Sequence, residues 1–184
     1  MTALAYHFLR IRGILILAVL FVCQLQAQKS EPCTTIILVR HAEKDSGGVN
    51  PPLTKRGMER AEALARTLAG TDVSTIYVSQ YLRTQQTVQA LATLRKIQPR
   101  QIDVDLSKPR LYAKALTDEI LKKHEGETVL VANHSNLIPS IIVALGAGTI
   151  DDIGDRTYDN LFIVVRSSSG TTKLLKLRYG APSE

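Results

Sequence analysis

An uninterrupted apolar, β-branched run near the start of the chain constrains the fold more than any other feature. Residues 34–39 read Thr-Thr-Ile-Ile-Leu-Val and end abruptly in Arg40 and His41. Such a run is typical of a buried strand, and a polar, Gly-bearing loop over residues 45–50 follows it. Open α/β sheets place their ligand sites at the carboxyl ends of strands, so Arg40 and His41 are candidates for a functional site.

Strand-like and helix-like segments alternate after this run, and a pair of strand-like segments ends the chain. From their hydrophobic period and their end signals, we expect helices over residues 54–69, 80–95, 111–124 and 135–145. Strands, of which the last two form a hairpin, are expected over residues 75–79, 101–105, 128–132, 161–165 and 173–177. This order predicts an α/β domain, a three-layer α/β/α sandwich with a mostly parallel central sheet and an antiparallel edge strand.

The first 27 residues differ in kind from the rest of the chain. Arg10 and Arg12 precede an uncharged apolar run over residues 13–23, and Ala27 offers a small residue of the type that precedes signal peptidase cleavage. We therefore predict a secretory signal peptide over residues 1–27.

This predicted leader also sets the expected location of the protein. Residues 28–184 are expected to form a single mature domain, exported to the periplasm or out of the cell. The uncharged stretch of residues 13–28 is shorter than the ~20 residues that a spanning helix needs. We expect no stable membrane span in the mature chain, and an uncleaved amino-terminal anchor is the alternative.

The composition is that of a globular domain, with 45% hydrophobic and 22% charged residues. The formal net charge is +6, and it would fall to +4 on removal of residues 1–27, which hold two arginines and no acid. The basic residues are scattered along the chain, so we expect no nucleic-acid partner. A moderate positive field favours a small anionic substrate. The lack of Trp gives no hint of an aromatic stacking platform.

Two segments around the first predicted strand resemble the signature of a known family. Residues 38–44, Leu-Val-Arg-His-Ala-Glu-Lys, and residues 53–57, Leu-Thr-Lys-Arg-Gly, resemble the histidine phosphatase superfamily, also called phosphoglycerate mutase-like. The family motif is usually Arg-His-Gly, and Ala42 takes the Gly position here, as in many phosphatase branches. The resemblance extends over residues 34–178.

Two further segments resemble the second and third motifs of the same family. Residues 78–87 resemble the motif in which an Arg in the first helical turn points at the phosphate, and this residue is Arg83. Residues 129–136 resemble the motif in which a buried strand delivers a second His, and this residue is His134. Three strands thus carry a His or Arg at or near their carboxyl ends, in the order that the family uses.

The resemblance implies a catalytic site of Arg40, His41, Arg83 and His134. A phosphoryl group in transfer spreads negative charge over three oxygens, and the planar forks of Arg40 and Arg83 match such oxygens bidentately. His134, if protonated, would add a third phosphate-binding donor. His41 would attack phosphorus and form a phosphohistidine that water hydrolyses. We expect no cofactor and no metal, since the sequence shows no acidic cluster with the spacing of metal ligands.

The general acid that protonates the leaving oxygen is the least defined part of this site. Many family members use a Glu between the second and third helices, but residues 97–110 here contain only Asp103 and Asp105 as acids. Asp105 is one candidate for this role. Glu43, two residues past the predicted nucleophile, is the other.

The predicted function is an exported phosphatase that hydrolyses phosphomonoesters or phosphoamidates through phospho-His41. The short segment over residues 97–110 most resembles the small phosphohistidine-phosphatase-like branch, with a shallow, open site for a phosphorylated small molecule or phosphoprotein. One alternative is a phosphoglycerate-type mutase, against which export and the missing Glu both argue. The other is a non-catalytic module that binds phosphate ligands, and the presence of His41 favours catalysis over this alternative.

Overall fold

The computed structural model describes residues 31–183. The predicted signal peptide lies outside the described residues. From Pro32 onward the chain forms one compact unit. Within the described part of the chain, no helix combines the length and the apolar character that a membrane crossing requires.

The described residues form one six-stranded sheet in the order β3-β2-β4-β1-β5-β6. The strands are β1 (Cys33–Arg40), β2 (Val73–Val78), β3 (Arg100–Gln101), β4 (Thr128–Asn133), β5 (Asn160–Ser167) and β6 (Thr172–Arg178). The first four run parallel to one another, whereas β5 pairs antiparallel with both β1 and β6. The predicted late hairpin therefore supplies the antiparallel side of the sheet, as expected.

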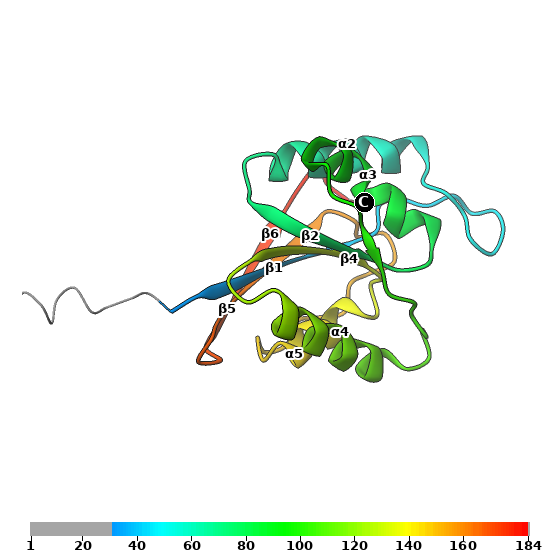
Figure 1. The fold of residues 1–184 in the computed structure, drawn as a ribbon. Helices are drawn as coiled ribbons and strands as arrows, with labels where there is room; N and C mark the ends of the chain where they lie inside the picture. Colours follow the sequence, from blue (N-terminus) through cyan, green and yellow to red (C-terminus); the bar gives the residue numbers. More distant parts are fainter. Residues whose placement is uncertain (1–30, 184) are drawn as a thin grey trace, which may run out of the picture. The chain divides into compact units, whose positions relative to one another are not determined.

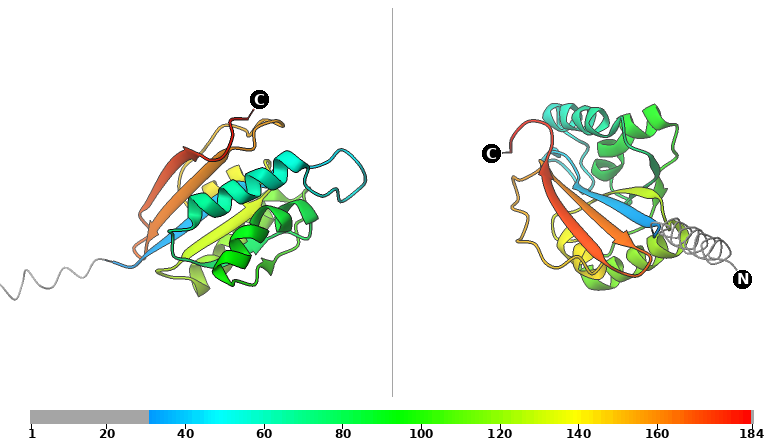
Figure 2. Two further views of the ribbon diagram at one scale, coloured as in Figure 1. Left: turned by 90° about the horizontal axis from the view of Figure 1, so that it is seen from above. Right: turned by 90° about the vertical axis from the view of Figure 1, so that its left-hand side faces the viewer.

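Two helices cover each face of this sheet (Figure 1 and Figure 2). One face carries α2 (Lys55–Leu68) and α3 (Leu82–Arg95), and the other carries α4 (Pro109–Lys123) and α5 (Ile138–Ala144). The predicted three-layer α/β/α sandwich with a mostly parallel sheet is confirmed.

The apolar run of β1 is buried on both of its faces because it lies between these two helical layers. Ile36 and Leu38 pack into the core shared with α4 and α5, and Ile37 and Val39 pack into the core shared with α2 and α3. All four side chains are at most 2% exposed. Each such side chain stabilises the fold by roughly 1.5–3 kcal/mol, so β1 anchors the centre of the domain.

The helices start and pack as their local sequences dictate. In α2, Thr54 caps the first turn by accepting a hydrogen bond from the Gly57 amide at 3.1 Å. In α3, Val88 and Leu91 are buried, whereas Leu94 at the same helical spacing is 57% exposed. Leu94 lines the groove between α2 and α3, at the margin of the helix face that meets the sheet.

The parallel pairing brings three strand ends to one edge of the sheet. Arg40 at the end of β1 is in register with Asn133 at the end of β4. On the other side of β4, β2 ends at Val78 and leads into α3. The segments that carry the three predicted motifs therefore leave the sheet side by side.

Candidate active site

His41 is buried, and one of its ring nitrogens is held by the backbone. Its Nδ1 lies 2.8 Å from the carbonyl oxygen of Ala42, which can only accept, so Nδ1 carries the proton and Nε2 keeps a free lone pair. Burial, together with the charges of Arg40, Arg83 and Lys44, lowers the pKa of His41 to about 3, although the bond to Ala42 opposes the shift. His41 is thus a neutral imidazole whose nucleophilic nitrogen is fixed by its tautomer.

His134 lies beside His41, with the ring centroids 5.4 Å apart. Its Nδ1 lies 3.5 Å from Nη2 of Arg83, which can only donate, so the proton is on Nε2, 3.1 Å from the hydroxyl of Ser79. Burial, and then the electrostatic effects of the neighbouring His41, Arg83 and Arg40, lower the pKa of His134 to about 3. His134 is therefore neutral, and the protonated form expected from the sequence requires a nearby anion to raise this pKa.

Arg40 is 5% exposed and is held from one side by a loop that precedes β5. Its Nη1 donates to the carbonyl oxygens of Gly154 at 2.7 Å and Thr157 at 3.1 Å. Its guanidinium carbon lies 4.2 Å from the centroid of the Tyr158 ring. Within residues 31–183, the buried Nε of Arg40 has no hydrogen-bond partner.

Arg83 is arranged in a similar way and lies beside His134. It is 8% exposed, and its guanidinium carbon lies 4.1 Å from the centroid of the Tyr81 ring. Its Nε is also buried without a hydrogen-bond partner in the described part of the chain. An unsatisfied buried donor costs about 1–3 kcal/mol. A bound anion close to Arg40 and Arg83 would offset the repulsion of their two charges.

Thr87 on α3 ties two of the motif segments together. Its hydroxyl accepts a hydrogen bond from the Ala42 amide at 2.8 Å and donates to the carbonyl of Arg83 at 2.6 Å. The peptide that follows the nucleophile and the first turn of α3 are thus fixed to each other, which holds His41 and Arg83 at a defined separation.

Gly57 is the residue that allows α2 to approach the nucleophile segment. A Cβ at this position would lie 2.2 Å from the carbonyl oxygen of Glu43, which no side chain tolerates. The same carbonyl accepts a hydrogen bond from the Thr54 amide at 2.9 Å. Residues 53–57, the second segment of the first motif, therefore pack the start of α2 against the segment that follows the nucleophile.

The two predicted general acids do not have the protonation state that this role needs. The Glu43 carboxylate accepts from Nε and Nη2 of Arg60 at 2.7–3.1 Å and lies 3.3 Å from Nε of Arg56. Burial opposes ionisation, but these partners lower the pKa of Glu43. Asp105 is exposed, and the hydroxyl and amide of Ser107, at 2.6 and 2.9 Å, lower its pKa. A general acid needs a raised pKa, which neither carboxyl has.

Tyr81 and Tyr158 are part of the site and were not predicted. The Tyr81 ring lies against Arg83, and its centroid is 5.3 Å from that of His134. The Tyr158 ring lies against Arg40, and its centroid is 6.1 Å from that of His41. Tyr81 is two residues before Arg83 and could have been noticed within the second motif. Tyr158 comes from a turn-rich loop, where the sequence carries no comparable signal. Among residues 31–183, no group of His, Cys, Asp and Glu is placed to hold a metal ion.

Comparison with known proteins agrees with this geometry. Residues 36–107 match the family model described as histidine phosphatase superfamily (branch 1). This part of the chain is therefore similar to the histidine phosphatase superfamily. The matched range includes Arg40, His41 and Arg83 and ends before His134. No curated protein matches the chain significantly by sequence.

Solved structures of several phosphatases share the fold of the chain. The protein histidine phosphatase SixA complexed with tungstate superposes with a TM-score of 0.59 at 20% identity, over 78% of this chain and 96% of SixA. The mycobacterial glucosyl-3-phosphoglycerate phosphatase superposes with a TM-score of 0.61 at 13% identity, over 81% and 99%. Phosphoserine phosphatase from Entamoeba histolytica, solved with 3-phosphoglyceric acid, superposes with a TM-score of 0.57 at 16% identity, over 80% and 97%. The family match over residues 36–107 supports phosphatase activity.

Proposed function

We propose that this protein is an exported, metal-independent phosphatase that hydrolyses phosphomonoesters or phosphoamidates through a phosphohistidine on His41. The observation that carries the proposal is the neutral His41, with its free Nε2, lying beside two buried arginines. Both Arg40 and Arg83 have an unpartnered Nε among the described residues. Such a site supplies a nucleophile and the fixed positive charge that phosphoryl transfer requires.

The reaction would proceed in two displacements at phosphorus. Nε2 of His41 attacks, an N–P bond forms, and the bond to the leaving oxygen or nitrogen breaks, with its electron pair going to the leaving group. The ring then carries a positive charge, which the bond from Nδ1 to the carbonyl of Ala42 stabilises. Water next attacks phosphorus, the N–P bond breaks, and phosphate leaves with His41 restored. Arg40 and Arg83 would bind the phosphoryl oxygens in both steps.

The incoming phosphoryl group would also change the protonation state of His134. Its negative charge favours the protonated imidazole, so the pKa of His134 rises from about 3 when the substrate binds. A protonated His134 then adds a third donor to those of Arg40 and Arg83. This coupling supports a role for His134 in phosphate binding rather than in nucleophilic attack.

The substrate would be a phosphorylated small molecule or a phosphoprotein. The segment between β3 and α4 is short, which leaves little protein to cover the site and supports an open entrance. SixA, a structural relative, is named as a protein histidine phosphatase. Export rests on the predicted leader over residues 1–27, and amino-terminal sequencing of the mature protein from a cell fraction would test it.

The decisive experiment compares the chain from Gln28 with its His41→Ala variant, using a chromogenic aryl phosphate in the presence of EDTA. An aryl leaving group hardly needs protonation, so a missing general acid cannot hide the nucleophile. We expect metal-independent turnover that falls by roughly 10³-fold or more in the variant. Full activity of His41→Ala would contradict the proposed mechanism.

Two other outcomes correspond to the alternative functions. An inactive wild-type chain that still binds vanadate would favour the non-catalytic phosphate-binding module. Transfer of the phosphoryl group to an acceptor hydroxyl instead of water would favour a phosphoglycerate-type mutase.

A further inference from the structure

The orientation of the Arg40 guanidinium depends on one loop, residues 154–158. Gly154 and Thr157 supply the two carbonyls that fix Nη1, and Tyr158 supplies the ring beside the guanidinium. Because the phosphate would bind the other nitrogens of Arg40, the position of residues 154–158 sets where those nitrogens point.

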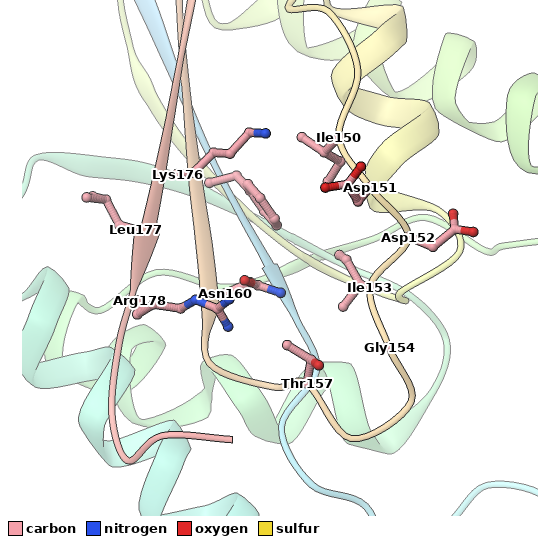
Figure 3. Close-up of a pocket in the computed structure, with 11 residues that line it drawn as sticks. Ile150, Asp151, Asp152, Ile153, Gly154, Thr157, Asn160, Lys176, Leu177 and Arg178 are labelled. Carbon is pink, nitrogen blue, oxygen red and sulfur yellow. The ribbon is translucent and has the colours of Figure 1, made fainter. Parts of the chain in front are cut away.

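This loop is not packed closely against the sheet on its other side. A cavity of about 330 Å³ separates it from β5 and β6, and Gly154 and Thr157 both lie on the cavity wall (Figure 3). Close packing normally fixes backbone in a core, and here that support is missing over one side of the loop. Ile153 anchors the start of the loop in the core, and the hydrogen bonds at the end of the loop hold residues 157–159 in place.

Those hydrogen bonds come from the C-terminal segment, residues 179–183. The hydroxyl of Ser183 accepts from the amides of both Tyr158, at 2.7 Å, and Asp159, at 3.1 Å. The amide of Ser183 donates to the Asp159 carboxylate at 3.3 Å, which also accepts from Arg178 at 2.6 Å. Burial opposes the shift, but these partners lower the pKa of Asp159 and keep it an acceptor.

The C-terminal segment is itself fastened to α2. Nη1 of Arg60 donates to the carbonyls of Tyr179 at 3.1 Å and Ala181 at 2.9 Å, and Arg56 donates to the carbonyl of Pro182 at 3.0 Å. The chain turns at Gly180, with φ of +67°, where a Cβ would crowd the Arg60 guanidinium at 3.2 Å. Because Arg60 also binds Glu43, a continuous set of contacts runs from the nucleophile segment through α2 and the C-terminus to the loop that holds Arg40.

We propose that Ser183 is a positioning residue for phosphate binding. Its hydroxyl fixes the amides of Tyr158 and Asp159, and so sets the loop that aims the guanidinium of Arg40 at the phosphoryl group. Ser183 touches neither substrate nor reacting atoms, and the proposal rests on the proposed function of Arg40 as a phosphate ligand.

The test compares the full-length wild type with three variants, Ser183→Ala, Ser183→Thr and a chain truncated after Pro182. Affinity for orthovanadate is measured by calorimetry, and KM and kcat are measured with an aryl phosphate. Ser183→Ala removes the acceptor of two amides, and we expect roughly 3- to 10-fold weaker vanadate binding and a rise in KM by a similar factor. The truncation should reproduce this loss, and Ser183→Thr, which keeps the hydroxyl, should restore most of the affinity.

Ser169→Ala, in the exposed turn between β5 and β6, is the matched control and should bind vanadate like the wild type. A merely structural role for Ser183 predicts lower thermal stability with unchanged affinity, and this result would overturn the proposal. Loss of folding in both Ser183→Ala and the truncation would overturn it as well. If the wild-type chain itself binds no vanadate, the proposed function fails, which is a different result from equal binding by wild type and Ser183→Ala.

Discussion

Arg60 binds the carboxylate of Glu43 through both Nε and Nη2, at 2.7–3.1 Å, with side chains that are 2% and 13% exposed. This buried ion pair joins α2 to the segment that follows the nucleophile. The same guanidinium holds the C-terminal segment through Nη1. Glu43 was predicted as a possible general acid, but in the fold its carboxylate holds Arg60 and so fastens α2 to the nucleophile segment.

We expect Glu43→Gln to destabilise the domain without changing its preference for leaving groups. Removing one partner of a buried ion pair leaves the other charge uncompensated, and Gln keeps part of the hydrogen bonding, so the free energy of unfolding should fall by about 2–4 kcal/mol. Urea denaturation measures this loss. Rates with an aryl and an alkyl phosphate should fall by the same factor.

A larger loss with the alkyl phosphate would identify Glu43 as the general acid, because only a poor leaving group needs protonation. Asp105→Asn is the matched variant for the other predicted acid. Since Asp105 is exposed and bonds mainly to Ser107, its replacement should leave both the stability and the ratio of the two rates nearly unchanged.

Gly57→Ala should destabilise the domain, although Gly to Ala in a helix usually stabilises by up to about 1 kcal/mol. The added Cβ would meet the carbonyl oxygen of Glu43 at 2.2 Å, a backbone atom that cannot move aside easily. We expect a net loss of about 2–4 kcal/mol in the free energy of unfolding. Gly47→Ala, which meets nothing within 4 Å, should be close to neutral by the same measurement. An equally stable Gly57→Ala would show that α2 does not need this close approach.

Much of the fold could be predicted because the relevant signals are local. The apolar run of β1 and the amphipathic face of α2 each follow from a few consecutive residues. The convergence of Arg40, His41, Arg83 and His134 also followed, because parallel strands end at the same edge of a sheet. The role of Gly57 becomes clear only when α2 is docked.

The rest of the site depends on contacts between residues far apart in the chain. The carbonyl of Gly154 that holds Arg40 is 114 residues away, and no periodicity or motif reports such a contact. The contacts of Tyr158 with Arg40 and of Ser183 with the loop could not be predicted for the same reason. Glu43 was predicted as an acid because it is near the nucleophile in sequence, but its protonation state is set by Arg60 on a different element.

Arg83→Lys should lower kcat/KM strongly even though the charge is kept. Lysine is a point charge without the planar fork, and it cannot lie flat over the Tyr81 ring as the guanidinium does. We expect a fall of roughly 10²-fold in kcat/KM with an aryl phosphate, the usual effect of losing one preorganised donor. Arg66→Lys on the exposed face of α2 is the control and should keep wild-type activity. A loss below about threefold, less than one typical hydrogen bond, would argue against a bidentate role for Arg83.

The two site histidines should make stability depend on pH in the mildly acidic range. Both have a pKa of about 3 in the folded protein, against 6.5 in an unfolded chain. Between these values the unfolded chain binds more protons, so the free energy of unfolding falls as the pH falls. The fall is at most about 1.4 kcal/mol per pH unit for each histidine. The best window is pH 5 to 6.5, above the range in which Glu43 and Asp159 titrate.

Comparison of wild type with His41→Ala in this window isolates the contribution of one histidine. We expect a shallower dependence of the urea midpoint on pH in the variant, because one group that protonates only on unfolding has been removed. Saturating vanadate should also flatten the wild-type dependence, since a bound anion raises the pKa of both rings toward that of the unfolded chain. The same slope in His41→Ala and wild type would mean that His41 is already protonated in the folded protein, and a protonated His41 could not attack phosphorus.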